Sequence, residues 1–153
     1  MSRRYFWLMT VAIMFAAVAP AGFYAQAAEN QDGAITIRAD GLRNSKGDVV
    51  CTLCSSAEGY PGDCKHKVTV KASIVGDHAD CVFPHKAPGY YGATIFHDED
   101  GDGKFKRSAL GIPKEGFGFS NNYRPKFRAP TWDEGKFHFA GGDKTITINM
   151  IYW

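Results

Sequence analysis

Three aspartates at alternate positions form the pattern in this sequence that most suggests a chemical role. Asp98, Asp100 and Asp102 lead to Gly103 in the order D-x-D-x-D-G, which matches the opening of a calcium-binding loop. Alternate carboxylates in a tight turn converge on one hard cation, and the glycine permits the backbone turn that adds a carbonyl ligand. The later position that should carry a bidentate glutamate is Ala109. No helical pattern flanks the loop, so a helix-loop-helix switch is excluded and we expect at most a weak calcium site.

Two other interpretations of this loop stay open. Asp and Gly are frequent in tight turns because they tolerate left-handed backbone conformations, so a purely structural turn explains the same residues. Lys106 lies close in sequence and would repel a cation bound at the aspartates. His97 precedes the loop and offers a nitrogen ligand, which makes a transition-metal site of His97 with Asp98 a further alternative.

A segment rich in glycine and aromatic residues follows, from Leu110 to Asp133. It has the period of neither a strand nor a helix, and loops of this length in compact domains are often functional. The residues best suited to binding are the stacking surfaces Phe117, Phe119 and Tyr123 and the hydrogen-bond donors Asn121 and Asn122. We expect them to contact a sugar or a peptide, or else the segment is a cover over one sheet edge with its aromatics facing inward.

Basic residues are interleaved with these two segments, at Lys104, Lys106, Arg107, Lys114, Arg124, Lys126 and Arg128. Such a cluster would attract an anionic glycan or a lipid head group. The whole chain has 18 basic and 16 acidic residues, and residues 1–27 contain two of the basic residues and no acidic one. The remaining 126 residues therefore carry 16 of each, and this balance gives no reason to expect nucleic acid as a partner.

The stretches His97–Phe105 and Leu110–Asn122, taken together, resemble the bacterial family catalogued as domain of unknown function 2141. The resemblance implies a small exported protein with an immunoglobulin- or transthyretin-like β-sandwich. It implies no activity, ligand or cofactor.

Catalytic motifs with a known mechanism do not occur in the sequence. We find no G-x-S-x-G, H-E-x-x-H, phosphate-binding loop or dinucleotide-binding fingerprint. Ser120 lies beside Asn121 without a histidine nearby in sequence. We therefore assign no catalytic residue, and a hydrolase of unknown type is the least favoured function.

Four cysteines, an even number, predict two disulfides in an oxidising compartment. Cys51 and Cys54 lie in a strand-like stretch where their side chains point to opposite faces, so a bond between them would be strained. We favour Cys51–Cys81 with Cys54–Cys64, and Cys51–Cys64 with Cys54–Cys81 is the alternative. A zinc site that includes His66, or a redox-active pair at Cys51 and Cys54, remains less favoured.

The N-terminus predicts export. Arg3 and Arg4 precede an apolar stretch, Leu8 to Ala19, and small residues at Ala25-Gln26-Ala27 suit cleavage before Ala28. The apolar stretch ends at Pro20, short of the roughly 20 residues that span a bilayer. We expect a signal peptide at 1–27, a single domain at 28–153 without a transmembrane segment, and a periplasmic or secreted location.

Short segments of alternating polar and apolar residues, separated by Gly, Pro, Asn and Asp, predict about seven strands and an all-β antiparallel sandwich with one long aromatic loop. The expected strands are residues 34–39, 49–54, 67–74, 80–83, 90–97, 136–139 and 144–153, the last two forming a hairpin. The function we expect is an accessory binding or interaction module that uses residues 97–132, with an envelope protein or a glycan as partner. A structural envelope protein without a small ligand is the alternative.

Overall fold

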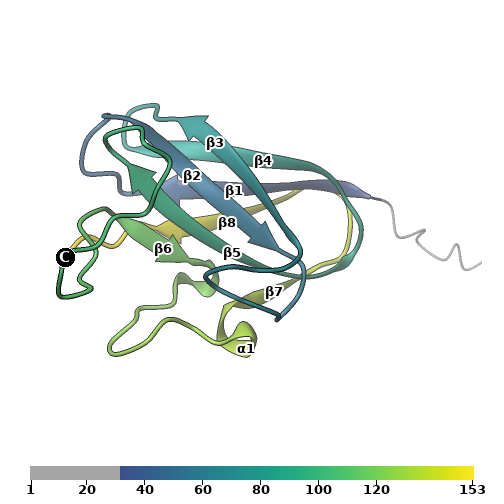
Figure 1. Ribbon diagram of the computed structural model, residues 1–153. Helices are drawn as coiled ribbons and strands as arrows, with labels where there is room; N and C mark the ends of the chain where they lie inside the picture. Colours follow the sequence, from purple (N-terminus) through teal and green to yellow (C-terminus); the bar gives the residue numbers. More distant parts are fainter. Residues whose placement is uncertain (1–31) are drawn as a thin grey trace, which may run out of the picture.

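The computed structural model describes residues 32–153, so the signal peptide predicted at residues 1–27 lies outside them. The described chain forms a two-layer sandwich of strands (Figure 1), which confirms the predicted fold class. The elements are β1 (Gly33–Asp40), β2 (Asp48–Cys54), β3 (Lys67–Ser73), β4 (His78–Lys86), β5 (Gly89–Asp98), β6 (Phe117–Phe119), one 3-10 turn (Ser120–Asn122), α1 (Trp132–Gly135), β7 (Lys136–Phe139) and β8 (Lys144–Asn149).

The two sheets have the strand orders β4-β1-β8 and β3-β2-β5-β6. Strand β7 pairs with the first half of β5, while β6 pairs with its second half. Neighbouring strands are antiparallel except β1 and β8, which run parallel with Ile37 opposite Ile146. Alternation along a strand shows which residues share a face but not the direction of the partner strand, so the sequence did not predict this parallel pair.

The hairpin predicted for residues 136–153 is wrong. Strand β7 belongs to the larger sheet and β8 to the smaller one, so the turn at residues 140–143 crosses between the sheets. Gly141 and Gly142 take positive φ angles of 96° and 71° there. Asp143 Oδ1 accepts the N–H of Ala34 at 3.1 Å, which ties the crossing to the start of β1. Two glycines predict a chain reversal, but they do not determine which strand the chain pairs with afterwards.

Apolar side chains of alternate positions fill the space between the sheets. Ile35, Ile37, Phe83, Phe139 and Ile148 are completely buried there. Two disulfides stabilise the sandwich: Cys51–Cys81 joins β2 to β4 across the two sheets, and Cys54–Cys64 closes the loop after β2. This is the pairing that the sequence favours, because alternation directs Cys51 into the core and Cys54 to the opposite face.

Candidate functional site

The outer face of the larger sheet, which points away from the smaller sheet, carries the candidate site. On β5 the even-numbered residues Thr94 and Phe96 point outward, since Ala93 and Ile95 belong to the core. Strand β6 extends this face, because Phe119 lies opposite Thr94 and Phe117 opposite Phe96. The pairing places three aromatic rings and a threonine side by side on one surface.

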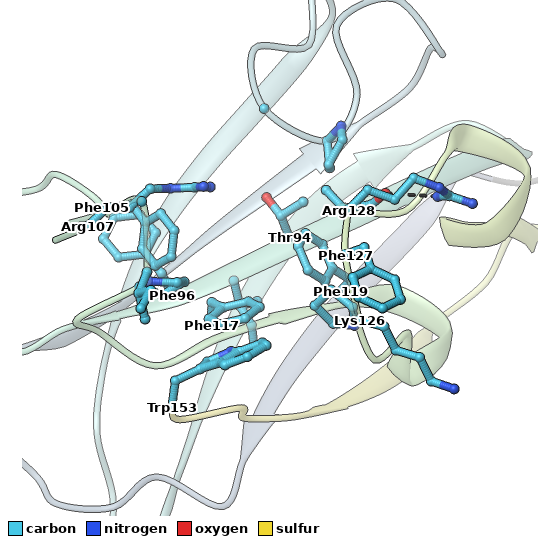
Figure 2. Close-up of a pocket in the computed structure, with 18 of the residues that line it drawn as sticks. Thr94, Phe96, Phe105, Arg107, Phe117, Phe119, Lys126, Phe127, Arg128 and Trp153 are labelled. Carbon is cyan, nitrogen blue, oxygen red and sulfur yellow. Dashed lines mark hydrogen bonds between the residues drawn. The ribbon is translucent and has the colours of Figure 1, made fainter. Parts of the chain in front are cut away.

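A groove of about 570 Å³ lies over this surface. Figure 2 shows its floor, formed by Phe96, Phe117 and Phe119 around Thr94. Residues 105–113 line one side and residues 125–129 the other, and Trp153 reaches it from the C-terminus. A volume of this size lies within the roughly 300–1,000 Å³ of most small-molecule sites.

Stacked rings hold the floor of the groove in place. The ring centroid of Phe105 lies 5.7 Å from that of Phe96 and 5.8 Å from that of Phe117. Phe117 and Phe119 are 5.7 Å apart, and Tyr123 lies 6.4 Å from Phe119. These are the offset and edge-to-face distances that aromatic pairs prefer. The sequence singled out Phe117, Phe119 and Tyr123 but missed the contribution of Phe96 and Phe105, although period-two alternation along β5 places Phe96 on this face.

The rim of the groove is apolar and unusually exposed. Phe127 is 101% exposed and Leu110 86%, and Ile112 and Trp153 are also exposed. Phe117 on the floor, by contrast, is only 7% exposed. Apolar side chains that cluster at the surface around a depression are typical of a binding site, whereas isolated ones are not.

The charged side chains that line the groove are all positive. Arg107, Lys126 and Arg128 line it, and no Asp or Glu among residues 32–153 does so. Arg128 pairs with Glu134 at 2.7 Å. Arg107 and Lys126 form no ion pair within the described chain. The guanidinium of Arg107 lies 5.2 Å from the ring centroid of Phe105, a cation–π contact that positions it beside the floor.

The two asparagines proposed as ligand donors hold the backbone instead. Asn121 Nδ2 donates to the carbonyls of Glu134 at 3.0 Å and Lys136 at 2.9 Å. Asn122 Nδ2 donates to the carbonyl of Thr147, and its Oδ1 accepts the N–H of Asn149 at 2.8 Å. Both side chains therefore fasten the aromatic segment to the sheets, and neither lines the groove.

Ser120 is a completely buried residue at the junction of β6 and β7. Its Oγ accepts the N–H of Ala93 at 2.9 Å, and its hydroxyl is within reach of the carbonyls of Ala93 and Gly135. The side chain thus replaces a backbone partner where β5 has no neighbouring strand. His97 lies four residues further along β5, roughly 13 Å away at the rise of an extended strand. The structure therefore does not bring Ser120 and His97 together as a nucleophile and a base.

His97 is instead part of a buried hydrogen-bond network. Its Nε2 donates to the carbonyl of Lys46 at 2.7 Å, and its Nδ1 lies 2.8 Å from the hydroxyl of Tyr152. The Tyr152 hydroxyl also accepts the N–H of Arg43 at 3.2 Å, and burial raises the pKa of this phenol. Both ring nitrogens of His97 are engaged, so in this arrangement neither is available to a metal with Asp98.

The acidic loop, residues 97–106, does bring its three aspartates together. One carboxylate oxygen of each of Asp98, Asp100 and Asp102 lies within 4.8 Å of the others. Asp98 is completely buried, and its Oδ2 accepts bonds from Lys71 Nζ at 3.1 Å and from the N–H of Gly103 at 2.9 Å. Its Oδ1 is buried and has no hydrogen-bond partner within the described chain.

The ammonium of Lys106 bridges two of these three aspartates. Lys106 Nζ pairs with Asp100 and lies 3.0 Å from Asp102 Oδ2. Hydrogen bonding to Lys106 lowers the pKa of Asp102, and the two aspartates raise the pKa of Lys106. The sequence identified Lys106 as a repulsive neighbour of a cation, and the structure places its ammonium against the same carboxylates.

A fourth carboxylate, Glu115, lies beneath the loop. It is buried, and its Oε2 accepts the N–H of Lys106 at 3.0 Å. Burial raises the pKa of Glu115, and the charges of Asp100 and Asp98 raise it further. The sequence gave no signal for this residue, because it is 13 positions after Asp102 and reaches the loop only through the fold.

Comparison with known proteins gives one family and no individual relative. No curated protein and no solved structure matches the chain. The family described as an uncharacterized protein conserved in bacteria, DUF2141, matches residues 37–147, which include every strand from β2 to β7 and the whole groove floor. The resemblance seen in the sequence is confirmed: this chain belongs to the bacterial DUF2141 family.

Proposed function

We propose that this protein is an exported binding module that holds an apolar ligand in the groove over the outer face of its larger sheet. The observation that carries the proposal is the combination of a recessed aromatic floor with a rim of exposed apolar side chains. Exposing the apolar side chains of Phe127 and Leu110 to water is unfavourable, and a ligand that covers them would gain the free energy of their burial. A purely structural role would not require this exposure.

Export is supported by the two disulfides of the chain. Disulfides form and persist in oxidising compartments, and both cysteine pairs of the chain are bonded. None of the helices in residues 32–153 has the length and apolar character needed to span a bilayer. We expect the protein recovered from the periplasm or the medium to begin at Ala28, which N-terminal sequencing would test. A retained Met1 on the recovered protein would contradict export by cleavage.

A pair of threonine substitutions tests the groove. Thr94 on β5 and Thr69 on β3 flank Thr52 in one row across the outer face; Thr94 and Thr52 line the groove, and Thr69 does not. Thr94→Phe should fill the groove, while Thr69→Phe places the same side chain on the same face outside it. Nile red, a neutral apolar dye, should gain fluorescence with the wild-type protein and the Thr69→Phe variant but not with Thr94→Phe.

Melting curves of both variants check that the fold is intact. Equal dye binding by the two variants would place the binding surface elsewhere. No dye binding by the wild-type protein would leave the structural envelope role as the better account.

Cation binding at the acidic loop is a second candidate function, favoured by the buried Asp98 Oδ1 that has no partner. A calcium ion there would have to displace the ammonium of Lys106 from Asp100 and Asp102. We therefore expect millimolar Ca²⁺ to raise the melting temperature of Lys106→Met clearly and that of the wild type less. A site with a Kd of about 0.1 mM stabilises by about 1.4 kcal/mol at 1 mM ligand.

The control is Asp100→Asn in the Lys106→Met background, which should remove the effect of Ca²⁺. If Ca²⁺ leaves the melting temperature of Lys106→Met unchanged, the acidic loop is a structural turn that its own lysines neutralise.

A further inference from the structure

We propose that the ligand of the groove is a single-chain amphipathic anion, an acyl chain that ends in a carboxylate or a phosphate, with Arg107 binding the anionic head. This inference rests on the proposed function, because it names the chemistry of the ligand in the same groove. It is carried by two independent properties of the lining: its apolar surface and the sign of its charges.

The apolar surface argues for an acyl chain and against a sugar. The floor consists of aromatic rings, and the rim residues Leu110, Ile112 and Phe127 are apolar as well. A sugar needs many hydrogen-bond partners for its hydroxyls, but no carboxylate of the described chain lines the groove and the nearby amides of Asn121 and Asn122 already bond to the backbone. Burying hydroxyls without such partners costs free energy, whereas burying methylene groups is favourable.

The charges argue for an anionic head. The groove is lined by cations and by no Asp or Glu of the described chain, and two of the cations have no counter-ion there. Arg107 is the better placed of the two. Figure 2 shows its side chain extending over the ring of Phe105 at one end of the floor, while the ammonium of Lys126 points away from the floor at the other end. A guanidinium held by a ring is preorganised to bind a carboxylate or phosphate through two N–H groups.

The shape of the groove favours a monomeric amphiphile over the surface of a bilayer. Exposed aromatic and aliphatic residues beside cations also suit docking to an anionic membrane. The aromatic floor, however, lies below the rim, since Phe96 and Phe119 are only partly exposed and Phe117 is buried, while the rim residue Phe127 is fully exposed. A bilayer surface would contact the rim and leave the floor empty, whereas one acyl chain reaches the floor.

Trp153 provides a built-in reporter for the test, because it lines the groove and is largely exposed. The chain has three tryptophans, and Trp7 lies in the predicted signal peptide, so in the protein that begins at Ala28 the substitution Trp132→Phe leaves Trp153 as the only indole. We would titrate this protein with decanoate, decyl phosphate and decanol, which share the chain and differ in the head. Both anions should shift the Trp153 emission to the blue with a Kd at least tenfold below that of decanol.

Arg107→Gln should raise the Kd of the two anions about tenfold and leave that of decanol unchanged. Lys114→Gln is the matched control, because Lys114 is an exposed cation of the same segment that does not line the groove. It should change none of the three constants. The anion whose Kd rises more in the Arg107→Gln variant, decanoate or decyl phosphate, shows whether Arg107 prefers a carboxylate head or a phosphate head.

Each contrary result has one meaning. If decanol binds as tightly as decanoate and Arg107→Gln has no effect, the head-group inference is overturned while the groove remains a binding site for apolar ligands. If no amphiphile binds and Nile red does not bind either, the groove function itself fails. If the protein sediments with phosphatidylglycerol vesicles but binds no monomeric amphiphile, the surface docks to membranes and the inference is overturned.

Discussion

The two faces of the larger sheet are formed by the same strands but differ in what covers them. On the inner face, Cys51, Ala93, Ile95 and Phe139 are closed off by the smaller sheet and by the Cys51–Cys81 bond. On the outer face, loops and the short helix α1 cover part of the sheet and leave the groove open. Alternation alone makes both faces, so the difference arises from what packs on each.

This difference separates stability from function. The inner face uses apolar side chains that exclude water, which is the main source of folding free energy. The outer face carries the aromatic floor at Phe96 and, one alternate position further along β5, the buried charge of Asp98. The aromatic side chains of the outer face are therefore gathered at the groove, where a ligand can reach them, whereas Asp98 is closed off by its own partners. The experiments below test whether the two faces differ in this way.

Truncating one phenylalanine on each face should give the largest contrast. Phe139 is completely buried between the sheets, whereas Phe119 is only partly buried in the groove. We expect Phe139→Ala to lower the free energy of unfolding by about 3–5 kcal/mol, the usual cost of such a cavity. Phe119→Ala should cost roughly 1–2 kcal/mol, because less apolar area is lost from a buried position. Urea unfolding of the two variants measures both values, and equal losses would show that the aromatic segment is a cover that has Phe119 as part of its core.

The disulfide that reaches the inner face, Cys51–Cys81, should stabilise the protein more than the surface disulfide, Cys54–Cys64. Cys51–Cys81 joins the sheets across 30 residues, while Cys54–Cys64 closes a surface loop of 10. The chain-entropy relation gives about 3.6 kcal/mol for the first bond and about 2.7 kcal/mol for the second. We would compare the double variants Cys51→Ala/Cys81→Ala and Cys54→Ala/Cys64→Ala by urea unfolding. A greater loss for the second pair would mean that the loop at residues 55–63 contributes more to the sandwich than the link between its sheets.

Sequence reasoning succeeded where alternation carries the information. It located seven of the strands and the cysteine pairing, since both follow from which face a side chain occupies. It missed β6 because three residues, Phe117–Phe119, are too few to show a period. It also predicted the wrong partner for β8, because pairing depends on which sheet a strand joins.

The candidate site was only half visible in the sequence. Residue types identified Phe117, Phe119 and the aspartates as candidates, but whether a side chain is free to bind a ligand depends on partners that are distant in sequence. Lys71, on β3, neutralises Asp98 from 27 positions away, and Asn121 is held by carbonyls of residues 134 and 136. A sequence shows which groups are able to bind a ligand, and only the fold shows which of them are already occupied.

The burial of Glu115 beside the acidic loop should have the smallest effect on the free energy of unfolding. Glu115 is buried near Asp98 and Asp100, and burial raises its pKa above the ordinary value of 4.5. The folded protein therefore holds this proton to a higher pH than the unfolded chain does. The stability that the proton confers is complete below about pH 4.5 and is lost as the pH rises through the raised pKa.

Glu115→Gln removes this loss while its amide oxygen still accepts the N–H of Lys106. We expect the variant to be more stable than the wild type by on the order of 1 kcal/mol at neutral pH, with the gap closing toward pH 4. Melting curves from pH 4 to pH 8 measure the gap. Asp32→Asn is the control, because Asp32 is exposed and forms no ion pair within the described chain, and its curve should follow the wild type. A Glu115→Gln protein that is less stable at neutral pH would show that the charge of Glu115 holds Lys106 in place, and the acidic loop would then be stabilised by this carboxylate rather than strained by it.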